Sequence, residues 1–168
     1  LFELCERESA AILSRDRPVV ERLVINCCAV KADVVAKDER EGGWRKILNF
    51  GHTVGHALES GLGHGRLRHG ECVAVGMLAE TAWSVESGHC GSDVLVRLDR
   101  LLEGLEMCRV VPTVTTEVLT EMVAVDKKRE GGTIEMAVPV RIGSVELHRL
   151  PIFEVLKMLD RVSVAVEG

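Results

Sequence analysis

The stretch RKILNFGHTVGHALES, residues 45–60, decides how the sequence is interpreted, because it combines helical periodicity with a row of polar side chains. His52 and His56 are four residues apart, so on a helix they project from the same face about one turn from each other. Two neutral imidazoles placed in this way can share a metal ion or pass a proton along a short path. The spacing alone leaves both roles open, together with an ordinary polar surface.

The residues around this pair extend the polar row. Arg45 and Asn49 precede His52 at helical spacing, so we expect one helix over residues 44–60 with a cation, an amide and two imidazoles on one face. Its other face would carry Ile47, Leu48, Val54 and Leu58. Gly51 and Gly55 flank His52, and each costs a helix roughly 1 kcal/mol relative to Ala. That cost predicts that another group comes close to the backbone at these glycines. The row of polar side chains itself predicts a ligand-binding surface.

The composition is typical of one soluble globular domain. The chain has 168 residues, of which 46% are hydrophobic and only 3% aromatic, with no Tyr. A core must therefore consist of aliphatic side chains, which favours packed helices. The net charge of -5 argues against a partner such as nucleic acid or an anionic membrane. An anionic ligand would need cations gathered locally.

The cysteines and the hydropathy indicate the compartment. Six cysteines are scattered without a CxxC pair, which is typical of buried, reduced thiols. No signal peptide is apparent, and no apolar run approaches the roughly 20 residues of a membrane span. We therefore expect a cytoplasmic protein.

Periodicity predicts a mainly α fold, a multi-helix domain with a small β-hairpin. Helical patterns cover residues 1–14, 19–36, 44–60, 70–86, 92–106, a segment after Pro112, and 151–164. Between the last two, TIEMAVPV and VELHRL alternate on either side of the turn RIGS, although Pro139 restricts the first strand to a sheet edge. Neither an alternating strand and helix pattern nor a glycine-rich phosphate loop is present.

Further candidates lie outside the first stretch. His69 directly precedes a helix, where it could face a neighbouring helix, and a zinc site with two histidines would need at least a third ligand such as Glu or Asp. His64 in the glycine-rich loop is a weaker candidate. Lys31 on an apolar helix and the cluster Lys127, Lys128 and Arg129 could hold anions, although such residues are more often solvated surface.

Three segments resemble the C-terminal part of the 3-dehydroquinate synthase family, in the same order along the chain. They are VKADVVAKDEREGGWRKILNFGHTVGHALE, RHGECVAVGMLAE and VDKKREGG. The resemblance implies a lyase that converts 3-deoxy-D-arabino-heptulosonate 7-phosphate to 3-dehydroquinate in the shikimate pathway. It also implies a catalytic NAD+, one Zn²⁺ (possibly Co²⁺) and a homodimer.

The same resemblance implies individual roles. His52 and His69 are similar to two zinc ligands of the family, which overrides the pairing of His52 with His56 that spacing alone would suggest. His56 resembles the histidine that contacts substrate and helps to move protons. Glu41 resembles an acidic residue near the substrate hydroxyls. Lys31 and Arg45 resemble the two cations that bind the substrate carboxylate. Asn49 and Lys127 resemble contacts on the phosphate side, with Lys128 as an alternative to Lys127.

The chain also departs from the family pattern. The resemblance covers roughly residues 19–145, and the family's third zinc ligand, a Glu, and its whole NAD-binding N-terminal domain lie before the point where this chain begins. We therefore expect a C-terminal zinc- and substrate-binding domain that is inactive alone and binds zinc weakly. Two alternatives stay open. The first is another sugar phosphate cyclase. Arg45 and Lys31 together argue against it, because they favour a substrate with a carboxylate. The second is a truncated, non-catalytic metal-binding domain.

Overall fold

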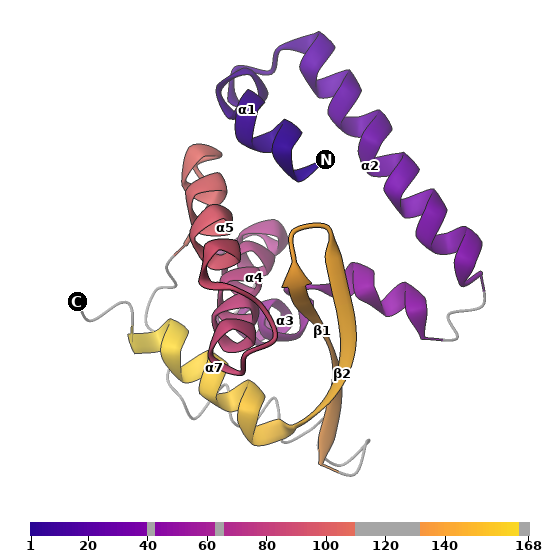
Figure 1. Ribbon diagram of the computed structural model, residues 1–168. Helices are drawn as coiled ribbons and strands as arrows, with labels where there is room; N and C mark the ends of the chain where they lie inside the picture. The colour runs from indigo at the N-terminus through magenta and orange to yellow at the C-terminus, as the bar shows by residue number, and fades with distance from the viewer. Residues whose placement is uncertain (40–42, 63–65, 110–131, 165–168) are drawn as a thin grey trace.

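The computed structural model describes residues 1–39, 43–62, 66–109 and 132–164, with side chains described to residue 159. Its elements confirm the mainly α class with one hairpin (Figure 1). In chain order they are α1 (Phe2–Leu13), α2 (Arg17–Lys37), the 3-10 helix η1 (Trp44–Asn49), α3 (His52–Leu62), α4 (His69–Glu86), α5 (Ser92–Gly104), β1 (Thr133–Arg141), β2 (Ser144–Pro151) and α7 (Ile152–Val164). The helix expected after Pro112 lies outside the described residues.

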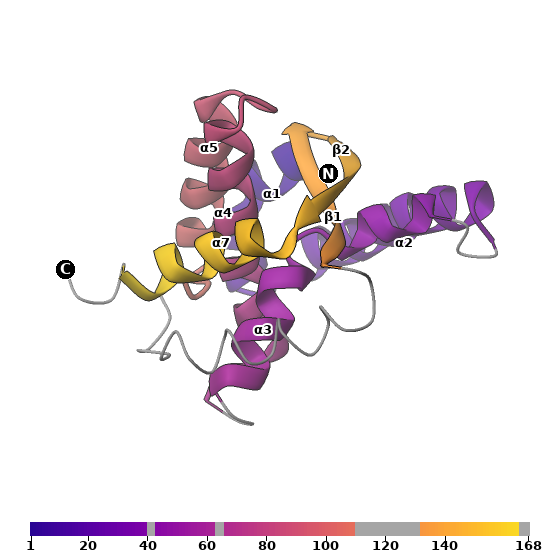
Figure 2. The ribbon, with the colours of Figure 1, turned by 90° about the horizontal axis from the view of Figure 1, so that it is seen from below.

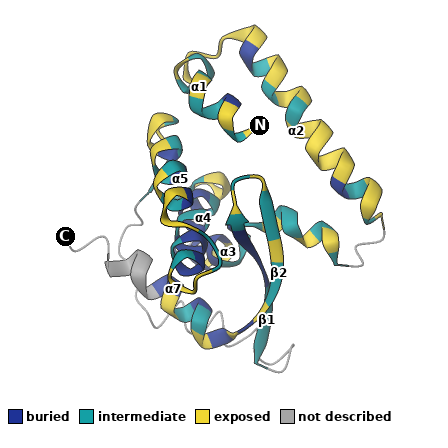
Figure 3. Ribbon diagram, viewed as in Figure 1, coloured by how far each residue is buried: buried dark blue, intermediate teal, exposed yellow. Residues whose placement is uncertain are grey.

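Helix α4 is the centre of the molecule. It contacts α3, α5, α7 and β1, and about half of the residues of α4 and of β1 are buried (Figure 3). One core joins apolar side chains from α3, α4, the hairpin and α7, among them Leu58, Val75, Met136 and Met158, each at most 1% exposed. The expectation of an aliphatic core is confirmed, because Trp83 is the only aromatic member of this cluster among the described residues.

Helix α2 projects away from α4 in both views, whereas α1 packs against α5 (Figures 1 and 2). The carboxylate of Asp16 accepts a hydrogen bond from the backbone N–H of Val19, and Pro18 lies in the first turn, so α2 begins two residues earlier than predicted. Most of α2 is exposed, including Cys27 and Cys28. The prediction of buried thiols is therefore wrong for these two residues, whereas it is confirmed for Cys72.

The predicted hairpin is confirmed, with its turn where RIGS placed it. Strands β1 and β2 pair antiparallel in a two-stranded sheet, and Arg141 pairs with Ser144 across the turn, in which Gly143 has a φ of +82°. The carbonyl of Pro139 accepts a hydrogen bond of 2.5 Å from the buried hydroxyl of Ser84 on α4. This bond ties the hairpin to the central helix.

The single helix predicted over residues 44–60 is wrong. The chain forms η1, breaks at Phe50 and Gly51, and restarts as α3. Gly51 has a φ of +82°, and a Cβ there would lie 2.7 Å from the carbonyl oxygen of Val73 on α4. A Cβ on Gly76 of α4 would likewise lie 2.8 Å from the nitrogen of Gly55. The close approach indicated by the glycines is thus the backbone contact between α3 and α4.

No helix among the described residues is both long and apolar enough to span a bilayer.

Candidate functional site

A cavity of about 600 Å³ brings together four of the predicted site residues, although the helix that was expected to align them is broken. Lys31 reaches the cavity from α2, Arg45 and Asn49 from η1, and His52 from the first position of α3. Lys46 also lines the cavity. The convergence therefore comes from the packing of three elements, and it gathers positive charge in an acidic chain.

Two carboxylates hold η1 against its neighbours. Asp38, at the end of α2, accepts hydrogen bonds from the backbone N–H groups of Gly43 at 3.0 Å and Arg45 at 2.8 Å. Glu135 on β1 accepts a hydrogen bond of 2.7 Å from the Nζ of Lys46. These contacts fix the segment that carries Arg45 and Asn49.

Three imidazoles meet beside the cavity. The ring centroids of His52, His56 and His69 lie 5.4 Å from each other in all three pairs. His52 and His56 come from α3, and His69 is the first residue of α4. The packing of α3 on α4 thus joins the histidine pair of the quoted stretch to the third histidine.

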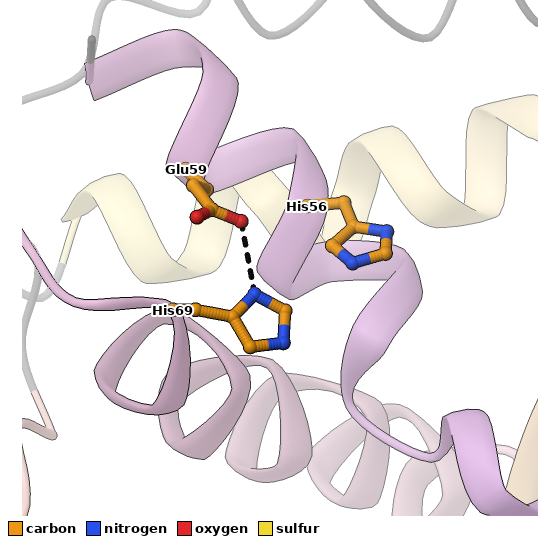
Figure 4. Close-up of side chains that lie close together, drawn as sticks. All are labelled: His56, Glu59 and His69. Carbon is orange, nitrogen blue, oxygen red and sulfur yellow. Dashed lines mark hydrogen bonds and ion pairs between the residues drawn. The ribbon is translucent and has the colours of Figure 1, made fainter. Parts of the chain in front are cut away.

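A carboxylate belongs to the same group. The Oε2 of Glu59 lies 3.0 Å from the Nδ1 of His69, and Figure 4 shows this contact bridging α3 and α4. Ligand atoms of His56, Glu59 and His69 all lie within 4.8 Å of one another. Nitrogen and oxygen donors of this kind suit Zn²⁺ or Co²⁺, so the residues fit a metal centre. Glu59 was not among the residues predicted from the sequence, although its three-residue spacing from His56 could have indicated it.

The surroundings of His56 favour its neutral form. Loss of water around the ring lowers its pKa, and the neighbouring imidazoles of His52 and His69 lower it further, while Glu59 acts in the opposite direction. A neutral imidazole can accept a proton or ligate a metal. Both roles suggested by the sequence are therefore chemically available at His56.

A second carboxyl group contacts the backbone at the start of α3, and it was also not predicted from the sequence. Glu80 on α4 is completely buried, and its side chain accepts hydrogen bonds from the backbone of Gly51 at 2.6 Å and Val54 at 3.2 Å. Burial raises its pKa to about 8, although these backbone donors oppose the shift. In the sequence, Glu80 is one polar residue in the apolar run of α4, without a local partner.

A family profile described as 3-dehydroquinate synthase C-terminal matches residues 1–129. The chain belongs to this family. It is 41% identical over 150 residues to the 3-dehydroquinate synthase of Geobacter metallireducens, covering 89% of this chain and 42% of that protein. It is 47% identical over 136 residues to the enzyme of Symbiobacterium thermophilum, covering 80% and 38%. The chain therefore spans less than half the length of these curated relatives.

Solved structures of other proteins share the fold of this chain. A 2-epi-5-epi-valiolone synthase from Streptomyces hygroscopicus subsp. jinggangensis 5008, with NAD+ and Zn²⁺ bound, superposes with a TM-score of 0.81 at 18% identity, covering 98% of this chain and 46% of that one. A 2-deoxy-scyllo-inosose synthase complexed with carbaglucose-6-phosphate, NAD+ and Co²⁺ gives a TM-score of 0.71 at 20% identity, covering 81% and 40%. At these identities the likeness establishes the architecture.

Part of the predicted site of the 3-dehydroquinate synthase domain lies outside the described residues. This applies to Glu41, His64, Lys127 and Lys128. The described members, Lys31, Arg45, Asn49, His52, His56 and His69, gather at the cavity and the imidazole group.

Proposed function

We propose that this chain is the metal- and substrate-binding part of a 3-dehydroquinate synthase, a carbon–oxygen lyase that acts on 3-deoxy-D-arabino-heptulosonate 7-phosphate in the shikimate pathway. The supporting observation is the meeting of Lys31, Arg45 and Asn49 with His52 in one cavity beside two further imidazoles. A substrate with a carboxylate and a phosphate needs such a local set of cations and donors in a chain of net charge -5.

His52 and His69 are the proposed metal ligands. The Nδ1 of His52 lies 3.3 Å from the carbonyl oxygen of Phe50, and the Nδ1 of His69 lies 3.0 Å from Glu59. An acceptor at Nδ1 favours a proton there and leaves Nε2 of each ring as the ligating atom. When bound, Zn²⁺ or Co²⁺ would act as a Lewis acid toward a substrate hydroxyl. A Glu from the N-terminal part of the longer enzymes is the proposed third ligand.

His56 is the proposed proton-transfer residue, with Glu41 as a second catalytic residue. The lowered pKa keeps the His56 imidazole neutral near pH 7, and a neutral ring can take a proton from substrate. Its ring adjoins both proposed ligands, so a substrate oriented by the metal would lie within reach of it. His56 is therefore assigned to the substrate and not to the metal.

Lys31 and Arg45 are the proposed partners of the substrate carboxylate. They approach the cavity from two elements, and a guanidinium with an ammonium can hold a carboxylate from two directions. Asn49 and Lys127 are assigned to the phosphate side, with Lys128 as the alternative. NAD+ is assigned mainly to the N-terminal domain of the longer protein, and a cytoplasmic homodimer completes the proposal.

A hybrid enzyme tests the proposal. This chain would replace the matching C-terminal part of the Geobacter metallireducens enzyme, and phosphate release from 3-deoxy-D-arabino-heptulosonate 7-phosphate would be measured with NAD+ and Zn²⁺. We expect turnover, its loss in the His56→Ala hybrid, and unchanged metal content in that variant. The full relative is the positive control. A hybrid that folds and binds metal but releases no phosphate contradicts the proposal.

The other sugar phosphate cyclases remain a second candidate because of the structural likeness. The same hybrid separates the two, since their substrates lack the carboxylate that Lys31 and Arg45 would bind. Turnover of a carboxylate-free heptulose phosphate that exceeds turnover of the acid would favour the second candidate.

A further inference from the structure

Helix α3 begins without a capping side chain of its own. Gly51 precedes its first residue, His52, and the carbonyl of Gly51 accepts the first helical hydrogen bond, from the N–H of Gly55 at 2.9 Å. Residues at this position usually supply a side-chain oxygen to the exposed N–H groups of the first turn. Gly51 cannot do so, and its φ of +82° together with the contact to Val73 and Met77 excludes a larger residue.

Glu80 supplies the missing cap from another helix. Its Oε2 accepts from the N–H of Gly51 at 2.6 Å and its Oε1 from the N–H of Val54 at 3.2 Å, with Thr53 contributing a further backbone bond. The side chain is fully buried, and burying an acidic group is costly unless its partners compensate. A hydrophobic residue in its place would leave the N–H groups at this helix start without acceptors.

The capped turn is the joint between η1 and α3, which both carry residues of the site. Asn49, the last residue of η1, lines the cavity on one side of the joint, and His52 follows on the other. We propose that Glu80 is a positioning residue, whose hydrogen bonds to residues 51–54 hold His52 against His56 and His69 and toward the cavity. This inference deepens the proposed function and rests on the metal role of His52.

The metal-free chain provides the first readout. Ring-proton NOEs between His52 and the other two histidines report the direction of His52, while the His56–His69 NOE is an internal control. In Glu80→Ala we expect the NOEs of His52 to disappear and the control NOE to remain. Glu80→Gln keeps one carbonyl acceptor of the same shape for the N–H groups of this turn, and it should retain the His52 NOEs. Unchanged His52 NOEs in a folded Glu80→Ala variant would overturn the proposal.

Co²⁺ titration followed by visible absorption provides the second readout. We expect Glu80→Ala to weaken Co²⁺ binding by about 10-fold or more, and Glu80→Gln to stay within about threefold of the unmodified chain. Ser84→Ala is the matched control, because Ser84 is equally buried on α4 but bonds to the hairpin. Equal weakening by Ser84→Ala would overturn the positioning role, since general loss of stability would then explain the effect.

Two further outcomes are also decisive. Should Glu80→Ala fail to fold, Glu80→Leu, which fills the volume without an acceptor, takes its place. Failure of both to fold would overturn the proposal and make Glu80 a residue of general stability. If the unmodified chain bound no Co²⁺, the proposed metal role would fail, whereas the NOEs, measured without metal, would still decide whether Glu80 positions His52.

Discussion

At the scale of single residues, the site depends on how each imidazole is held. His69 has Glu59 at its Nδ1, His52 has the carbonyl of Phe50 at its Nδ1, and His56 lies beside both rings with a lowered pKa. These differences divide three chemically identical side chains into two proposed ligands and one proposed proton carrier. Spacing alone could not give this division, because His52 and His56 are equivalent members of one pattern; the resemblance to the family implied it.

Replacing Glu59 tests this division. We expect Glu59→Gln to weaken zinc binding by about 10- to 100-fold, because the carboxylate orients the ring of His69. Competition with a chromophoric chelator measures the affinity. Glu103→Gln, an exposed carboxylate on α5 paired with Arg109, is the control and should leave the affinity unchanged. An unaltered affinity in Glu59→Gln would show that His69 does not need this partner.

At the scale of elements, the decisive feature is the contact between α3 and α4. Gly51 and Gly55 on one side and Gly76 on the other let the two backbones approach until added Cβ atoms would collide. This approach sets His69, at the start of α4, beside His52 and His56. The imidazole group thus depends on glycines that have no chemical role of their own.

Gly76→Ala should therefore destabilise the chain by about 1–3 kcal/mol, since a methyl group there would force the helices apart. Urea unfolding followed by circular dichroism measures the free energy. Gly70→Ala lies in the same helix with open space around its Cβ position, so it should be neutral or slightly stabilising. Equal free energies for the two variants would mean that the helices do not pack as closely as described.

Sequence periodicity predicted most elements, because amphipathic helices and the hairpin carry their signal locally. Val54 and Leu58 are completely buried, as their side of the helical pattern required. The break at Gly51 was missed because the apolar spacing continues across it while the tertiary contact with α4 imposes a positive φ. Glu59 and Glu80 were missed for a related reason, since their partners lie on other segments and only folding brings them together.

At the scale of the whole molecule, a chain of net charge -5 gathers cationic side chains at the proposed substrate cavity. Lys31, Arg45 and Lys46 line one cavity, while the buried Glu80 lies behind it in the core. The low aromatic content predicted the aliphatic core that carries this arrangement. The exposed helix α2 contributes Lys31 to the site, so α2 belongs to the proposed binding surface.

The buried Glu80 should make stability depend on pH. Its folded-state pKa of about 8 is above the ordinary value of 4.5, so between these values the folded state binds more protons than the unfolded state. The free energy of unfolding should therefore fall as pH rises from about 4.5 to 8, by up to about 1.4 kcal/mol per pH unit from this group. Urea unfolding across this range should show a flatter profile for Glu80→Gln. Parallel profiles would mean that Glu80 titrates near its ordinary pKa.

His52 and His69, held by α3 and α4, are proposed to form a metal half-site that leaves His56 for the substrate. Calorimetric titration of the chain with Zn²⁺ tests this proposal. We expect weak binding of one ion, lost in His52→Ala and in His69→Ala and retained in His56→Ala, with His89→Ala as an unaffected control. Loss of zinc in His56→Ala with retention in His52→Ala would contradict the account and assign the metal to His56, Glu59 and His69.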